Sequence, residues 1–68
     1  MKLGFIGCGN MAGAIMGGII KEGICKPEEI IGADLFEPGR KKVQETYGIQ
    51  VTADNKEVAE QVDVLFLS

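Results

Sequence analysis

The stretch that decides the fold is GFIGCGNMAGAI, residues 4–15, which places three glycines among its first six positions. The glycines end a short apolar run over residues 2–6, which we therefore predict to be a strand. Helical spacing follows over residues 10–21, where Met11, Ile15 and Ile19 form an apolar row that Met16 and Ile20 extend. The stretch thus predicts a glycine-rich turn that joins a strand to a helix.

The remaining pattern keeps alternating strands with helices. Short apolar runs predict further strands over 30–33, 49–51 and 62–68, the last apolar from Val64 on. The helices between them are expected to begin near Pro38 and at a cap formed by Asp54. The last strand is apolar at successive positions, as in strands that are covered on both faces. The fold class predicted is α/β, a Rossmann-type doubly wound parallel sheet of which this chain holds the first four strands.

The glycine stretch contains a sequence that matches the dinucleotide-binding pattern G-x-G-x-x-G/A, namely Gly7-Cys8-Gly9-Asn10-Met11-Ala12. Gly7 permits the tight turn, Gly9 lets a pyrophosphate approach the backbone, and Ala12 keeps the helix close to the sheet. The amides near Asn10 and Met11 would point at the phosphates, assisted by the helix dipole. The alternative is that these glycines only make a tight turn between strand and helix.

Asp34 ends the second predicted strand, about 20 residues beyond the motif, where such sites carry an acidic residue. A carboxylate there accepts hydrogen bonds from the adenosine ribose and repels a 2′-phosphate, which favours NAD over NADP. Arg40 would pair with that phosphate if it lay close, although a solvated surface charge is the preferred interpretation. For Asp34, the alternative is a carboxylate that only ends a strand.

Composition sets the class of protein. The 68 residues are 46% hydrophobic and 25% charged, which is typical of a globular domain rather than a disordered chain. A net charge of −3 without a long basic run argues against a nucleic-acid partner, and no apolar stretch has the about 20 residues of a membrane span. We therefore expect a cytoplasmic protein without nucleic-acid or membrane partners.

The chain has two cysteines and no histidine, so no metal site is expected. Cys8 and Cys25 are interpreted as small buried thiols, with Cys8 reactive only if it lies in an open cleft.

The sequence MKLGFIGCGNMAGAI over residues 1–15, followed by Gly18 and Gly23, resembles the N-terminus of pyrroline-5-carboxylate reductase, the last enzyme of proline biosynthesis. The likeness continues over residues 52–57 and 63–68 and so covers essentially the whole chain. Part of the first motif is shared with β-hydroxyacid dehydrogenases and other reductases.

The resemblance implies an NAD(P)H-dependent oxidoreductase that reduces 1-pyrroline-5-carboxylate to L-proline. It implies that Gly7, Gly9, Asn10 and Met11 hold the cofactor pyrophosphate and that Asn55 reaches the adenosine ribose or its phosphate. On local grounds alone, Asn55 is equally a polar residue in a helix's first turn. Ser68 lies where the fourth strand is expected to reach the cofactor crevice.

The resemblance also implies a longer protein. Residues 1–68 would be part of an N-terminal NAD(P)-binding domain, and a C-terminal domain outside this chain would dimerise and supply the substrate pocket. No residue of the chain is a credible general acid, so no catalytic residue is assigned, and the piece alone is expected to be inactive.

Asp34 departs from the family, which mostly uses NADPH and often has serine, or asparagine with arginine, at that position. We therefore predict that NADH is accepted at least as well as NADPH. Two alternatives stay open: another NAD(P)-dependent dehydrogenase of the β-hydroxyacid type, and a non-catalytic dinucleotide-binding module.

Overall fold

The computed structural model describes residues 1–67, and the prediction for Ser68 lies outside them. Strands and helices alternate along the chain, as the sequence pattern predicts. In order they are β1 (Leu3–Ile6), α1 (Asn10–Lys21), the 3₁₀ turn η1 (Pro27–Glu29), β2 (Ile30–Ala33), α2 (Glu37–Tyr47), β3 (Gln50–Thr52), α3 (Asn55–Gln61) and β4 (Val64–Leu67). The third strand begins one residue later than predicted.

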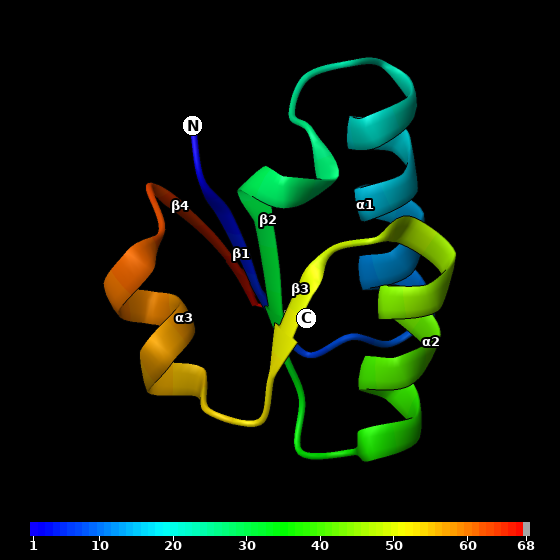
Figure 1. Cartoon of the computed structure of the whole chain (residues 1–68). Helices are drawn as coiled ribbons and strands as arrows, with labels where there is room; N and C mark the ends of the chain where they lie inside the picture. Colours follow the sequence, from blue (N-terminus) through cyan, green and yellow to red (C-terminus); the bar gives the residue numbers. More distant parts are fainter. Residues whose placement is uncertain (68) are drawn as a thin grey trace.

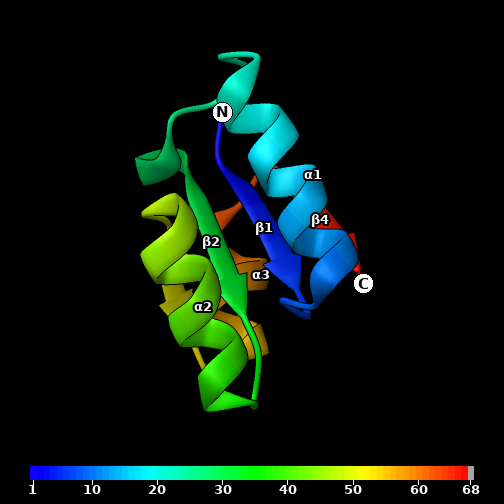
Figure 2. The same cartoon turned by 90° about the vertical axis from the view of Figure 1, so that its right-hand side faces the viewer.

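All four strands are parallel and lie in the order β3-β2-β1-β4. Helices α1 and α2 cover one face of the sheet and α3 covers the other, as the two views in Figure 1 and Figure 2 show. The predicted α/β fold is therefore confirmed. Because the strands are parallel, their carboxyl ends meet at one edge, where α1, α2 and α3 each begin.

The larger core lies between the sheet and the pair α1 and α2. Its fully buried side chains include Phe5 and Met16, and the Phe5 ring stacks on Phe66 with ring centroids 4.7 Å apart. The predicted apolar row of α1 is wrong at its first positions, because Met11 is 73% exposed and Ile15 is 36% exposed. The rest of the predicted stripe does face the core, since Met16 is buried and Ile19 and Ile20 pack against it. Ala12 takes the core position in the first turn, where its small side chain allows close approach to the sheet.

Tyr47, at the end of α2, packs against two glycines of α1. A Cβ atom placed on Gly17 would lie 3.1 Å from the Tyr47 ring, and one on Gly13 would lie 3.7 Å from it. Gly18 faces open space, with nothing within 4 Å of such an atom. Close helix packing therefore explains Gly17, whereas a side-chain carbon at Gly13 would make an ordinary contact and one at Gly18 would make none.

A smaller cluster lies on the α3 face, where Val58 is fully buried against Ile31 and Ala33. A Cβ atom on Gly4 would come within 2.5 Å of Val58, so α3 sits directly on the β1 backbone. The expectation that β4 is covered on both faces is wrong for the described residues. Its Leu67 is 77% exposed because β4 lies at the edge of the sheet and α3 packs mainly over β1 and β2.

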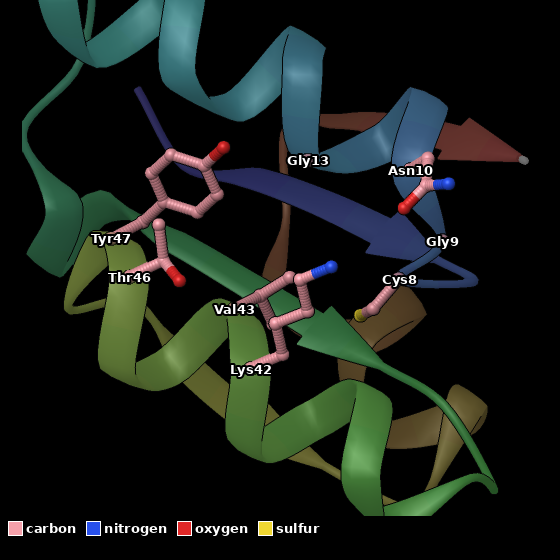
Figure 3. A pocket seen from close by; sticks show the side chains of 8 residues that line it. All are labelled: Cys8, Gly9, Asn10, Gly13, Lys42, Val43, Thr46 and Tyr47. Carbon is pink, nitrogen blue, oxygen red and sulfur yellow. The ribbon is translucent and has the colours of Figure 1, made fainter.

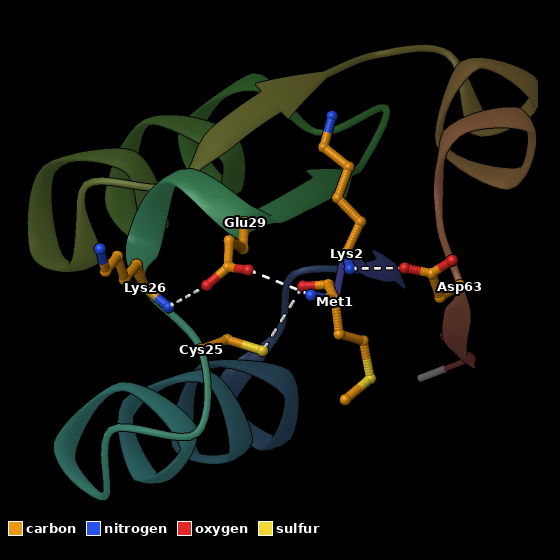
Figure 4. A network of polar contacts seen from close by, with 6 residues as sticks. All are labelled: Met1, Lys2, Cys25, Lys26, Glu29 and Asp63. Carbon is orange, nitrogen blue, oxygen red and sulfur yellow. Dashed lines mark hydrogen bonds and ion pairs between the residues drawn. The ribbon is translucent and has the colours of Figure 1, made fainter.

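Polar contacts hold the beginning of β1, as Figure 4 shows. The amino group of Met1 pairs with Glu29 Oε2 at 3.1 Å, which raises the pKa of that amine. The hydrogen bond from the Lys26 backbone amide, and after it the Met1 amine, lower the pKa of Glu29. The backbone amide of Lys2 donates to Asp63 Oδ2 at 2.8 Å, beside β4. The first strand is thereby tied to segments that are far from it in the sequence.

Candidate dinucleotide site

The residues of the glycine motif and Asp34 meet at an open hollow on the carboxyl edge of the sheet. Its volume is about 550 Å³, which lies in the range of about 300–1,000 Å³ typical of small-ligand sites. The lining residues are Gly7, Cys8, Gly9, Asn10, Met11, Ala12 and Asp34. The structure therefore brings together six of the eight residues that the sequence predicted for a cofactor site.

The first turn of α1 opens on this hollow. Gly9 is the N-cap and supplies no side-chain hydrogen bond, and the first turn holds no acidic residue. The first intrahelical bond runs from the Gly13 amide to the Gly9 carbonyl at 2.9 Å. The amides of the preceding residues have no acceptor within the helix, as at every helix start. Such a terminus, with its positive dipole end, suits an anion.

Gly9 and Gly7 serve the loop in different ways. A Cβ atom on Gly9 would meet nothing within 4 Å, so the missing side chain leaves open space rather than avoiding an internal clash. Gly7 has φ +94°, a conformation that side chains rarely adopt, and its amide donates to the Ala33 carbonyl at 2.8 Å. Gly7 therefore makes the turn, while Gly9 keeps the backbone accessible, as the motif predicted.

The carboxylate of Asp34 accepts two backbone hydrogen bonds. Oδ2 takes the amide of Cys8 at 2.9 Å, and Oδ1 takes the amide of Phe36 at 3.0 Å. These bonds, the Phe36 amide first, lower the pKa of Asp34 below its usual range. Asp34 is thus ionised at neutral pH and half-buried beside the glycine loop.

Arg40 is not the solvated surface charge that the sequence favoured. Its side chain is 20% exposed, and Nη1 donates to the main-chain oxygen of Asp34 at 2.7 Å. Nη2 lies 3.9 Å from the carboxylate of Glu37, one turn earlier in α2. The side chain is half-buried because α2 begins at Glu37, three residues after Asp34, and its first turn directs Arg40 back toward the end of β2.

The thiol of Cys8 is buried, as predicted, and lies 3.7 Å from the Ala33 carbonyl oxygen. Burial, with a smaller contribution from the Asp34 charge, raises the pKa of Cys8 to about 11. The thiol therefore stays protonated at neutral pH, which makes it a poor nucleophile. A Cβ atom on Gly32 would lie 2.8 Å from this sulfur, so the glycine in β2 makes room for it.

A second cavity, of about 110 Å³, lies between α1 and α2 beside the glycine loop. Figure 3 shows the Lys42 side chain extending from α2 toward the first turn of α1, with Thr46 and Tyr47 along the same helix. This cavity is far smaller than the hollow and below the usual size of small-ligand sites. The hollow is therefore the candidate site for a dinucleotide.

Asn55 is not among the residues that line the hollow. It is exposed at the first position of α3, at the carboxyl edge of the sheet. The last of the predicted site residues, Ser68, lies outside the described part of the chain. Sequence reasoning missed the Cys8 and Phe36 amides as partners of Asp34. The Phe36 contact had a signal, since aspartate before a helix often bonds the amide two residues on.

The chain matches, over residues 2–68, a protein family described as "NADP oxidoreductase coenzyme F420-dependent". The chain belongs to this family. A nicotinamide dinucleotide is therefore the class of cofactor that its fold serves.

Individual relatives are more specific. The chain is 45% identical over 67 residues to the pyrroline-5-carboxylate reductase of Methanosarcina acetivorans, covering 98% of this chain and 25% of that protein. It is 40% identical over 68 residues to the enzyme of that name from Escherichia coli, covering 96% of this chain and 24% of the relative. The resemblance found in the sequence is therefore confirmed.

A solved structure of a pyrroline-5-carboxylate reductase from Coxiella burnetii superposes with a TM-score of 0.90 at 33% sequence identity. The match covers 98% of this chain and 24% of that one. The chain thus spans about a quarter of the length of the relatives it matches. Among residues 1–67, none of the helices is long and apolar enough to cross a membrane.

Proposed function

We propose that this chain is the dinucleotide-binding segment of a pyrroline-5-carboxylate reductase, which reduces 1-pyrroline-5-carboxylate to L-proline. The observation that carries the proposal is the uncapped start of α1, which opens on the hollow beside Asp34. Relatives with that enzyme name at 35% to 45% identity support the reaction.

Each predicted site residue has a role in this proposal. The backbone of the loop, from Gly7 to Ala12, holds the pyrophosphate against the first turn of α1. Asp34 accepts hydrogen bonds from the adenosine ribose. Asn55 reaches the adenosine end of the cofactor from the start of α3. Ser68 would contact the cofactor at the end of the fourth strand.

NADH is proposed to bind at least as well as NADPH. Asp34 is ionised, and a 2′-phosphate beside it would experience like-charge repulsion. Arg40 offers limited compensation, because its guanidinium already donates to the main-chain oxygen of Asp34. Titration of the intact protein with both cofactors tests this, and a preference of about tenfold or more for NADPH, a difference of about 1.4 kcal/mol, would contradict it.

The cofactor supplies the hydride from its nicotinamide ring when it is bound. The residues described here bind and orient its adenosine and pyrophosphate end, which contributes positioning rather than proton transfer. The substrate pocket is proposed to lie in a further, C-terminal domain that also forms a homo-oligomer. We further propose that the protein works in the cytoplasm.

The experiment is an assay of the intact protein for proline formation, with dinucleotide affinity measured in parallel. Proline formation with NADH or NADPH supports the reductase. Turnover of a hydroxy acid instead would indicate a β-hydroxyacid dehydrogenase, and dinucleotide binding without turnover would indicate a non-catalytic module. Because the family description names coenzyme F420, a reaction of F420 with NADP is a further arm of the assay.

A further inference from the structure

Asp34 connects three segments at the carboxyl edge of the sheet. Its carboxylate binds the amide of Cys8 in the glycine loop and the amide of Phe36 at the start of α2. Its own amide donates to the Thr52 carbonyl at 3.2 Å, and its carbonyl accepts from Arg40. Both the backbone and the side chain of Asp34 are therefore fixed before any ligand arrives.

The glycine loop is the segment that needs such support. Cys8 stands between two glycines, which lose more conformational freedom on ordering than any other residue. Hydrogen bonds from an amide to a carboxylate are charge-assisted and roughly twice as strong as neutral ones. The bond from Cys8 to Asp34 thus holds the middle of the loop, and the neighbouring Gly9 and Asn10 line the hollow.

We infer that Asp34 is a positioning residue for the pyrophosphate loop as well as an acceptor for the ribose. This inference rests on the proposed function. If Asp34 only accepted hydrogen bonds from the ribose, its one effect would be to favour binding of NADH over NADPH. Because Asp34 also holds the loop through the Cys8 amide, it supports the binding of both dinucleotides. Removing its charge therefore does not change the cofactor preference to NADPH.

Inorganic pyrophosphate separates the two roles because it has no ribose. In an Asp34→Asn variant, loss of a negative charge near the loop would by itself tighten the binding of this anion. The substituted amide has one acceptor oxygen and an NH2 group that cannot accept, so at most one of the two backbone bonds survives and it is no longer charge-assisted. The weaker hold on the loop weakens pyrophosphate binding. We expect Asp34→Asn to raise the dissociation constant of pyrophosphate by about threefold or more, and that of NADH by about tenfold or more. Pyrophosphate binding that is unchanged or tighter in the variant would overturn the inference.

Asp54→Asn is the matched control. Asp54 also follows a strand at this edge, and its Oδ1 accepts the amide of Lys56 at 2.9 Å, but it does not line the hollow. It should leave pyrophosphate affinity unchanged. An equal loss of affinity in both variants would indicate general destabilisation and would overturn the inference.

A measurement on the unaltered protein covers the case in which Asp34→Asn does not fold. The Cys8 amide should exchange its hydrogen at least about tenfold more slowly than the Asn10 amide, which has no acceptor within its helix. Equal exchange rates would mean that Asp34 does not hold the Cys8 amide, and would overturn the inference. If the unaltered protein binds neither NADH nor NADPH, the proposed function fails. If it binds them while the pyrophosphate test fails, only this inference is lost.

Discussion

Helices α1 and α3 both begin at the carboxyl edge of the sheet, yet their first turns are completed in different ways. In α3, the Asp54 carboxylate accepts the Lys56 amide at 2.9 Å, and Glu57 adds a negative charge to the first turn. In α1, the N-cap is Gly9, which has no side chain to offer, and the first turn has no acidic residue. One terminus is completed by the chain itself, whereas the other is left for an anion from outside.

The largest effect is expected from filling the space that Gly9 leaves open. Gly9→Val should weaken dinucleotide binding by about a hundredfold or more, since the side chain occupies the path of the pyrophosphate. Stability should fall by no more than about 1 kcal/mol, the difference between a good and a poor N-cap. Isothermal titration with NADH and urea unfolding measure the two effects.

Gly18→Ala is the control for this substitution. Its Cβ also meets nothing within 4 Å, but Gly18 does not line the hollow. It should stabilise α1 by up to about 1 kcal/mol and leave affinity unchanged. Unchanged NADH binding by Gly9→Val would contradict the assignment of the loop.

The contrast between the helices can be reduced by giving α1 the acidic first turn of α3. Asn10→Asp places a carboxylate at the first position of α1. It should stabilise the helix by about 0.3–1 kcal/mol through its dipole. The same charge repels a pyrophosphate, so affinity for NADH should fall about tenfold. Added salt should recover part of the loss, and an affinity that stays equal at low salt would count against an anion site here.

The opposite change removes the cap of α3. Asp54→Ala leaves the Lys56 amide without its side-chain acceptor and should destabilise the protein by about 1 kcal/mol. Affinity for inorganic pyrophosphate, which lacks the adenosine that Asn55 is proposed to reach, should not change when it is measured well below the unfolding transition. Urea unfolding and titration at the same temperature provide the comparison, and a loss of pyrophosphate affinity would mean that the cap of α3 also supports the loop at the start of α1.

The smallest effect concerns pH. The pKa of Asp34 is lowered in the folded protein, so its contribution to stability is complete above the unfolded pKa of about 4. That contribution is lost as the pH falls through the lower, folded value. Unfolding measured from pH 6 down to pH 3 should show a shallower loss of stability for Asp34→Asn than for the unaltered protein. Parallel curves would mean that the two backbone bonds to Asp34 do not form.

Several features of the site could be predicted from the sequence because they depend on local backbone requirements. The positive φ of Gly7 and the open position of Gly9 follow from the motif. The placement of Asp34 beside the loop follows from two parallel strands that end together. The bond between Cys8 and Asp34 could not be predicted, because it depends on the exact orientation of a main-chain amide.

The buried face of α1 shows the same limit. The spacing of Met11 and Ile15 is helical, but periodicity does not tell which of two neighbouring rows meets the sheet. Ala12 and Met16 occupy the core because a small residue at Ala12 allows the helix to approach the strands. The prediction that Arg40 is a solvated surface charge is wrong because it depends on tertiary structure in the same way. Only the short connection from β2 to α2 brings the Arg40 guanidinium to the main-chain oxygen of Asp34.

The sequence by itself determined the alternation of strands and helices, the glycine loop and the acidic residue after the second strand, because each follows from local backbone preferences and spacing. Only the tertiary structure decided that Asp34 is held by two main-chain amides, that Arg40 is half-buried and that the start of α1 has no side-chain cap. These features require segments distant in the chain to meet at one edge of the sheet, and their contacts are set by packing.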